Sequence, residues 1–361
     1  MKAYCPEPLA HVPVHPLFYF KYQPGERPRG LFKENLPPNY FEHDVAYVGA
    51  ATKAEVIVLP NNFTSFDSAA EAYVAGHADE AERLGIPLFL FSFGDFTDRL
   101  HFDPRAYIFR LSIYRSALGP RDISVSTLTE DLGQAGIHVR SRGSVPRVSF
   151  CGQAGYQTFK QWIKYYLKVL AYTGRPARRL GVYWRRRMMQ ACRNSKWVTT
   201  TFIIRRSFSG AQRTIELDPV LARQEFVDSI IGADFVLAPK GDGNYSNRFL
   251  EALSLGRIPV YVDTDMVLPL EEIIDYTKIA VRVPMHQVVQ TPQYIKKFYD
   301  ALTEGEWRER QELARTTFAT YLRHDSFFAT YFQSFGLPPS IPHNKKPLKD
   351  DGSARNDVKA Y

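Results

Sequence analysis

The sequence predicts an α/β protein of two consecutive domains, each built on a doubly wound parallel sheet, with helices at the C-terminal end. Its 361 residues suit two domain cores better than one. Short apolar runs alternate with helical stretches in both halves, which is typical of parallel sheets. The alternation stops at residues 139–145, which are rich in Gly, Ser and Arg, and then restarts. We therefore expect an N-terminal domain over residues 1–145 and a C-terminal domain over residues 146–320.

The elements of the first half follow from apolar runs and their punctuation by Gly and Pro. They are a strand at 17–22, a strand at 55–59, a helix at 68–84 that ends at Gly85, strands at 86–93 and 107–113, and a short helix at 127–132.

The second half repeats the pattern and then becomes helical. Its elements are a strand at 147–151, a helix at 158–172, strands at 235–238 and 258–262 on either side of a helix at 246–255, and helices from an N-cap at Thr291 to about 335. Residues 321–336 should form a last helix, for which a return to the first domain is left open. Residues 337–361 hold many charges and prolines and should be a flexible tail.

Charge is unevenly distributed along the chain. The net charge is +8, but residues 175–206 alone carry nine Arg and one Lys without Asp or Glu, which leaves −2 for the remainder. Such a segment is either a solvated helix flank or a site for anions. The anion could be a diphosphate, an acidic acceptor, nucleic acid or an anionic membrane surface, and charge alone does not choose among them.

Apolar runs and cysteines bear on the location of the protein. No run reaches the roughly 20 apolar residues that span a bilayer, and the first residues lack the apolar core of a secretory signal. Cys5, Cys151 and Cys192 are odd in number and lack metal-ligand spacing. We expect a cytoplasmic protein without a transmembrane segment, and we leave peripheral membrane contact open.

One segment carries chemistry, the strand, glycine loop, helix and strand of residues 234–262. Pro239 should end the first strand at the carboxyl edge of the sheet, where α/β folds bind ligands. Gly241 and Gly243 would let backbone amides turn toward a ligand, and Ser246 is a good N-cap for the helix that follows. The helix would direct its positive end at a phosphate. Lys240 and Arg248 should add full charges at the same rim, with Arg248 on an exposed helix face.

Glu251 lies three residues after Arg248 and should share its face of the helix. A carboxylate there suits a ribose diol, because it accepts two hydrogen bonds; the alternative is a simple ion pair with Arg248. The loop is neither a Walker loop nor a G-x-G-x-x-G fingerprint. Asn244 and Tyr245 complete the loop and are expected to bind the same ligand.

The run from Pro239 to Glu251, PKGDGNYSNRFLE, followed by GRIPV at 256–260, resembles the donor-site signature of the exostosin family of glycosyltransferases. KWVTTTFIIR at 196–205 and LPL at 268–270 are similar to bacterial members. This resemblance implies a GT-B fold, in which two Rossmann-like domains face a cleft and the C-terminal one binds a nucleotide-activated sugar. It also implies that Ser246 and Arg248 meet the diphosphate, that Glu251 meets the ribose, and that the anomeric centre inverts.

The expected reaction is transfer of a sugar from a nucleotide-diphosphate sugar, with UDP as the favoured nucleotide, to a glycan or glycoconjugate acceptor. An acidic or lipid-linked acceptor stays open. Two alternatives share the fold or the site: a sugar-nucleotide epimerase, and a sugar-nucleotide or anion-binding protein without catalysis. A nucleic-acid-binding protein would interleave aromatic residues with arginine, for which Tyr183-Trp184 beside Arg185 is the one hint. We expect no nucleic-acid partner.

Catalysis needs a base for the acceptor hydroxyl. The candidates follow strands of the first domain: Asp95, which we favour, and then Asp67, Asp98 and His101. Asp95 should face the cleft, although a cap at a strand–helix turn is an equal alternative.

The charge of the leaving diphosphate should be met without metal, by Arg248, Lys240 and the helix N-terminus. Asp263-Thr264-Asp265 matches the D-x-D that binds metal in the other large transferase fold, but this short pattern is a common accident. We expect no metal and no other cofactor. Arg205 ends an apolar strand and should reach the substrate, whereas residues 185–187 should form a solvated face.

Overall fold

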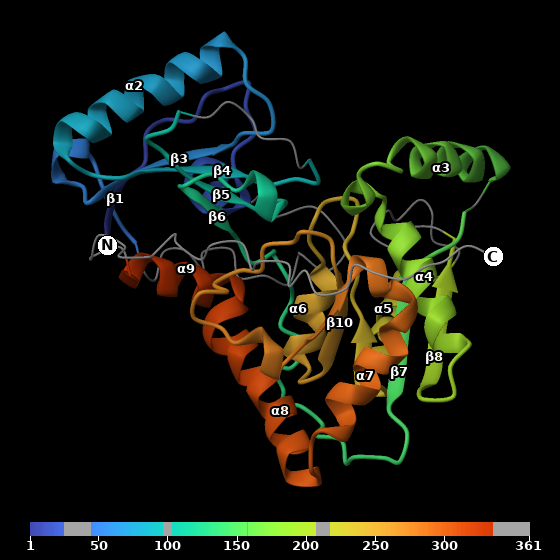
Figure 1. Ribbon diagram of the computed structural model, residues 1–361. Coiled ribbons are helices and arrows are strands. Elements are labelled where there is room, and N and C mark those ends of the chain that lie inside the picture. The colour runs from blue at the N-terminus through green and yellow to red at the C-terminus, as the bar shows by residue number, and fades with distance from the viewer. Residues whose placement is uncertain (25–44, 97–102, 157, 207–216, 335–361) are drawn as a thin grey trace, which may run out of the picture.

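A computed structural model describes residues 1–24, 45–96, 103–156, 158–206 and 217–334. Two parallel sheets form the two halves of the molecule (Figure 1). The first sheet has the strand order β2-β1-β3-β4-β5-β6 and the second the order β11-β10-β9-β7-β8. Every pair of neighbouring strands in both sheets is parallel. The prediction of an α/β protein with two parallel sheets is therefore confirmed.

The first sheet is built from six short strands that run from the N-terminus to residue 124. They are β1 (Lys2–Tyr4), β2 (Ala46–Val48), β3 (Val56–Asn62), β4 (Leu88–Ser92), β5 (Tyr107–Arg110) and β6 (Asp122–Ser124). Helix α2 (Ser68–Leu84) covers one face of this sheet (Figure 1). Asp67 caps its start, accepting a hydrogen bond from Ala70 N at 2.8 Å, and Gly85 ends it in the left-handed conformation with φ of 68°.

The second sheet consists of β7 (Arg147–Gln153), β8 (Thr199–Arg205), β9 (Phe235–Leu237), β10 (Ile258–Asp263) and β11 (Val281–Pro284). Its helices are α3 (Phe159–Ala171), α4 (Gly181–Arg193), α5 (Pro219–Ile231), α6 (Asn247–Ser254), α7 (Thr291–Asp300) and α8 (Glu304–Thr317). Phe235 of β9 contacts the rings of Phe298, Tyr299 and Trp307, so α7 and α8 close the core on one side of this sheet.

The last helix returns to the first domain. A short π-helical turn (Phe318–Leu322) follows α8 and leads into α9 (His324–Ser334). Phe328 of α9 lies 6.1 Å from Phe91 and 5.6 Å from Phe109, measured between ring centroids. The face of the first sheet opposite α2 is therefore covered by residues from the end of the described chain, below the sheet in Figure 1.

Several expectations about single elements were wrong. Residues 17–22 belong to a 3-10 turn (Pro16–Phe18) and to α1 (Tyr19–Tyr22) instead of a strand, because His15 Nδ1 accepts a hydrogen bond from Leu17 N and caps that turn. Residues 127–132 form no helix. The side chain of Thr127 instead bonds that of Thr129 at 2.7 Å, a local contact that competes with helix formation.

Other expectations were wrong at the ends of elements or missed elements altogether. Thr291 is the first residue of α7, and Gln290 takes the N-cap position without a side-chain hydrogen bond. Strands β1, β2 and β6 were not predicted, because they are three residues long and leave almost no periodic signal. Helix α5 and strand β11 were not predicted either. The other 3-10 turns in the described part of the chain are Ala51–Lys53, Arg115–Ala117, Pro176–Arg178, Tyr276–Lys278 and Met285–Gln290. Within the described ranges, each helix is too short or too polar to cross a bilayer.

Candidate functional site

The glycine loop joins β9 to α6 at the carboxyl edge of the second sheet, as its sequence predicts, and it enters the interface between the two domains. Asn244 is buried there. Its backbone N–H donates to Ser112 Oγ at 2.8 Å, its Nδ2 donates to Ile113 O at 2.9 Å, and Thr264 Oγ1 donates to its Oδ1 at 2.8 Å. In this structure Asn244 therefore connects the domains.

Two glycines of the loop differ in their roles. The N–H of Gly241 donates to Tyr245 O at 2.8 Å, so the expectation that this amide turns toward a ligand was wrong. At Gly243 a Cβ would lie 3.0 Å from Asp95 Cα, so glycine is needed there for close approach of the two domains. Tyr245 OH donates to Asp95 Oδ1 at 2.9 Å. Ser246 precedes α6 at the N-cap position, but its side chain makes no cap hydrogen bond.

Lys240 is buried, so the expectation that it lies at the rim was also wrong. Its Nζ donates to Ala177 O at 3.0 Å and to Tyr114 OH at 3.3 Å. Burial lowers the pKa of Lys240 to about 8, because water no longer solvates the ammonium group, and nearby Asp242 offsets part of this effect. An ammonium with this pKa gains from any anion that binds beside it.

Arg248 lies in the first turn of α6 and is half-buried, which corrects its expected place on an exposed face. Its Nη2 donates to Cys151 O at 2.8 Å, at the end of β7. The guanidinium carbon lies 4.3 Å from the ring centroid of Phe150. A Cβ at Gly152 would lie 2.6 Å from Nη2, so a side chain there would displace the guanidinium from this position. The φ of 147° at residue 152 also favours glycine.

Arg185 of α4 joins Arg248 at this place, and the expectation of a solvated face was wrong for this residue. Its Nη1 donates to Gln153 O at 3.0 Å, two residues beyond the carbonyl that holds Arg248. Arg186 and Arg187 are exposed as expected. A signal in the sequence could have identified Arg185, because it lies on the apolar stripe of Val182, Met189 and Cys192, at spacings of three, four and seven residues.

The two arginines form an electropositive site. Among the described residues neither guanidinium forms an ion pair with a carboxylate, although the charges of Glu251 and Asp242 act on Arg248 and Arg185 respectively. The Nε atoms of Arg185 and Arg248 are both buried and have no hydrogen-bond partner among the described residues. Burial, together with the charge of Arg248, lowers the pKa of Arg185 to about 10, and burial also lowers the pKa of Arg248. Two neighbouring desolvated cations are costly alone and are stabilised by an anion. The end of β7 and the N-terminus of α6 together suit an anionic group.

Arg205 lies beside this site, on the strand that pairs with the end of β7. It ends β8, the edge strand, and its Nη2 donates to Ala222 O at 2.9 Å and to Glu225 Oε2 at 3.0 Å. In this structure α5 holds the guanidinium of Arg205, and the expectation that Arg205 reaches the substrate stays a prediction. Sequence position could not show this, because the end of an apolar strand is equally compatible with a cleft and with a helix partner.

Glu251 is held by a residue that the sequence analysis did not select. Arg223 Nη1 lies 3.3 Å from Glu251 Oε1, and Arg223 Nη2 lies 2.6 Å from Glu130 Oε2. Burial raises the pKa of Glu251, and the charge of Arg223 opposes this rise. The carboxylate thus pairs with α5 rather than with Arg248, one turn further into α6 than the basic site.

The D-x-D residues are both engaged. Asp263 Oδ2 accepts a hydrogen bond from Arg282 Nε at 2.9 Å. Asp265, at φ of 62°, accepts hydrogen bonds from Ser116 N at 3.0 Å and Ser116 Oγ at 2.5 Å. One carboxylate thus pairs within the second domain, and the other joins this turn to the first domain.

Among the base candidates, Asp95 is brought opposite the glycine loop by its contact with Tyr245. Asp67 caps α2 and pairs with His11 Nε2 at 2.8 Å, which assigns it a structural role. Asp98 and His101 lie outside the described residues, as does the tail 337–361.

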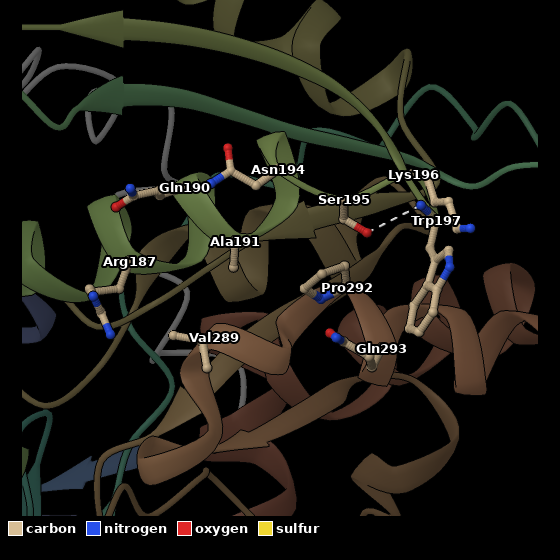
Figure 2. Close-up of a pocket in the computed structure, with 10 residues that line it drawn as sticks. All are labelled: Arg187, Gln190, Ala191, Asn194, Ser195, Lys196, Trp197, Val289, Pro292 and Gln293. Carbon is tan, nitrogen blue, oxygen red and sulfur yellow. Dashed lines mark hydrogen bonds between the residues drawn. The ribbon is translucent and has the colours of Figure 1, made fainter.

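A separate cavity of about 620 Å³ lies at the far end of α4 (Figure 2). It is lined by the end of α4, the segment before β8 and the start of α7, with Gln190, Asn194, Trp197, Val289 and Pro292 among its residues. Arg187 of α4 also lines it, but Arg185, Arg248 and the residues of the glycine loop do not. This cavity is therefore distinct from the basic site beside Gly181 and the glycine loop.

Residues 168–298 match the family model of the exostosin GT47 domain. This part of the chain is thus similar to the glycosyltransferase domain of the exostosin family. The match covers the second domain from α3 to α7, including the glycine loop and both arginines. An Exostosin-1 homolog of Caenorhabditis elegans is 30% identical to the chain over 101 residues, which are 28% of this chain and 25% of that protein. The alignment thus spans about a quarter of the relative's length.

Solved glycosyltransferases resemble the chain at low sequence identity. A glycosyltransferase from Rickettsia africae has 9% identity and a TM-score of 0.36, and the match covers 78% of this chain and 89% of that one. An alpha-glucosyltransferase in complex with UDP-glucose and DNA has 10% identity and a TM-score of 0.33, with 82% and 86% covered.

Proposed function

We propose that the protein is an inverting glycosyltransferase that moves a sugar from a nucleotide-diphosphate sugar, with UDP as the nucleotide, to a glycan or glycoconjugate acceptor. The observation that carries this proposal is the pair Arg185 and Arg248, two half-buried cations with unsatisfied Nε atoms among the described residues. They lie at the carboxyl end of β7 within an exostosin GT47 match. A diphosphate supplies the charge and the acceptor oxygens that such a pair needs.

The proposed chemistry is a single displacement. Asp95, across the glycine loop, takes the proton of the acceptor hydroxyl, whose oxygen forms a bond to the anomeric carbon. The bond from that carbon to the diphosphate breaks on the opposite side, and the nucleotide diphosphate leaves. Arg185, Arg248 and the positive end of α6 stabilise the charge that develops on it. Tyr245 fixes the orientation of Asp95 through its 2.9 Å hydrogen bond.

Binding of UDP in the presence of EDTA tests the donor site. We expect Arg185→Ala and Arg248→Ala each to weaken binding at least about tenfold, because each removes a charge-assisted contact. Arg193→Ala is the matched control, since this exposed arginine of α4 lies over the ring of Phe202 and should leave binding unchanged. Equal UDP binding by all three variants would refute the assignment of Arg185 and Arg248 to the donor site. UDP binding that needs added Mn²⁺ would refute the prediction that no metal is required.

Turnover separates the proposal from its alternatives. Incubation with UDP-sugars and a panel of glycan acceptors should give a product whose anomeric configuration, read by NMR, is opposite to that of the donor. Conversion of the donor sugar without an acceptor would indicate an epimerase. Binding without transfer or hydrolysis across the panel would favour a non-catalytic sugar-nucleotide-binding protein.

A cytoplasmic location stays a prediction, based on cysteines that are all unpaired in the structure.

A further inference from the structure

Helix α3 exposes a continuous apolar face. Its 13 residues include none that is buried. Phe159 is 73% exposed and Leu167 is 60% exposed, and four further large apolar side chains are also exposed, namely Trp162, Ile163, Tyr166 and Leu170. At 100° per residue these six side chains share one side of the helix. An apolar face of this size on a protein surface marks an interaction site.

The helix is attached to the domain by a different side. Tyr165 and Val169 are its half-buried residues, and the ring of Tyr165 lies 4.9 Å from that of Tyr156. Arg186 of α4 lies over the ring of Tyr156, 5.9 Å from its centroid. In Figure 1, α3 stands away from both sheets, above α4. The attachment therefore holds α3 in place while leaving its apolar face uncovered by the described residues.

The charge around α3 identifies what can cover this face. Lys160, Lys164 and Lys168 recur every four residues along one border of the apolar face. From residue 132 to residue 215 the chain has 17 Lys and Arg and no Asp or Glu. A second copy of the chain would bring the same positive charge to the same contact and would be repelled. A partner with an apolar interior and a negatively charged surface layer would match both the apolar face of α3 and the lysines along its border.

We propose that α3 is an interfacial helix that docks the protein on an anionic lipid bilayer. Its apolar face enters the boundary between headgroups and acyl chains, Trp162 and Tyr166 lie at the headgroup level, and the three lysines contact anionic headgroups. Thirteen residues are too few to span the bilayer, so the helix lies in the plane of the surface. Because α3 follows β7, docking brings the carboxyl end of β7 toward the lipid surface. This inference does not depend on the proposed activity.

Vesicle flotation with the full chain tests the proposal. The probes are vesicles of phosphatidylcholine with one quarter phosphatidylglycerol, and vesicles of phosphatidylcholine alone. Wild-type protein should bind the anionic vesicles, and added salt should weaken the binding. The double variant Leu167→Glu with Leu170→Glu should bind at least about tenfold more weakly, because it puts charge into the apolar face.

Two further variants separate the charge of α3 from general effects. Replacing Lys160, Lys164 and Lys168 by Gln should weaken binding to anionic vesicles by about fivefold for each lysine, whereas replacing them by Arg should preserve it. Leu313→Glu is the matched control, since Leu313 is an exposed leucine (38%) of α8, a helix that lies well away from α3 in Figure 1. Circular dichroism and thermal unfolding should show that all variants are folded.

Three results would overturn the proposal. They are no binding of wild-type protein to the anionic vesicles, equal binding by the α3 glutamate variant and by Leu313→Glu, and a concentration-dependent dimer in sedimentation experiments that the α3 variant abolishes. The last would assign the face to a second copy. UDP binding by the α3 variants should match wild type, so a failed donor site and a failed membrane site are distinguishable.

Discussion

Gly152 shows how one residue controls the basic site. It lies at the end of β7 with φ of 147°, and its missing side chain leaves room for Arg248. Nothing in the sequence singles it out, because it is a single glycine at the end of a strand. Its role comes from the helix that packs across it.

We expect Gly152→Ala to lower the free energy of unfolding by about 1–3 kcal/mol, because alanine is strained at this φ, and to weaken UDP binding by displacing Arg248. Gly49→Ala is the control, since a Cβ there meets nothing within 4 Å, and its effect should stay within about 0.5 kcal/mol. Urea unfolding and calorimetric titration measure the two effects. Unchanged UDP affinity in Gly152→Ala would contradict the placement of Arg248 at the diphosphate.

Lys240 predicts a pH dependence of nucleotide binding. Its pKa of about 8 lies below that of a solvated lysine, and a bound diphosphate favours the charged form. Above pH 8 the free protein must take up a proton to bind, so the affinity for UDP should fall as the pH rises from 7.5 to 9. Lys240→Met should remove this slope. Titrations at both pH values give the answer, and an identical slope in the variant would show that another group titrates.

The lowered pKa of Lys240 also makes the stability of the protein depend on pH. Raising the pH should increase stability, whereas it should weaken UDP binding. Between the folded pKa of about 8 and the higher unfolded pKa, the unfolded chain binds more protons than the folded one. Stability therefore rises with pH across this window, as the cost of the buried ammonium disappears. The advantage of Lys240→Met in unfolding free energy should accordingly be greatest below pH 8 and should decrease above it.

At the scale of elements, α4 is the helix that connects the basic segment to the glycine loop. A Cβ at Gly181, its first residue, would lie 2.3 Å from Lys240 O and 2.5 Å from Gly241 O. The helix thus begins directly against the loop backbone, and Arg185 follows one turn later on the buried stripe. The apolar periodicity of α4 determines which of its arginines reaches the site.

We expect Gly181→Ala to destabilise the protein and to reduce UDP binding, because the added methyl group must push α4 away from the loop. Gly305→Ala is the control near the start of another helix, α8, where a Cβ meets nothing within 4 Å. That change should stabilise the protein by about 0.4–1 kcal/mol, since it restricts the unfolded chain. Destabilisation by Gly181→Ala together with stabilisation by Gly305→Ala, both measured by urea unfolding, would support the close contact between α4 and the loop. Stabilisation by both changes would contradict it.

At the scale of the whole molecule, the two domains are tied together by the return of the chain. Helix α9 covers the first sheet through Phe328 and Phe332. Asn244 and the ion pair of Arg115 with Glu271 add polar contacts across the interface. The core of the first domain thus includes residues from the end of the described chain.

Phe328→Ala should lower the free energy of unfolding by about 3–5 kcal/mol, the usual cost of deleting a buried phenyl ring, since Phe328 is 1% exposed. Hydrogen exchange should then accelerate most in β4 and β5, whose Phe91 and Phe109 lose their partner. Tyr321→Ala, at a 37% exposed position just before α9, should have little effect. Faster exchange confined to the second domain would contradict the role of α9 in the first.

The sequence by itself determined the repeating α/β pattern, the boundaries of α2 and the position of the glycine loop at the carboxyl edge of a sheet. These features depend on periodicity, caps and turn residues, which act over a few neighbouring positions. Its resemblance to the exostosin family lies in the same local run, and the match of residues 168–298 confirms it.

Only the tertiary structure decided which charges come together. It paired Arg185 with Arg248, gave Arg205 to Glu225 and Glu251 to Arg223, and used Asn244 to join the domains. The physical reason is that the environment of a charged side chain depends on partners far away in the sequence, and burial changes its energy by several kcal/mol. Sequence spacing places a residue on one side of a helix, but the elements packed against that side determine what it binds.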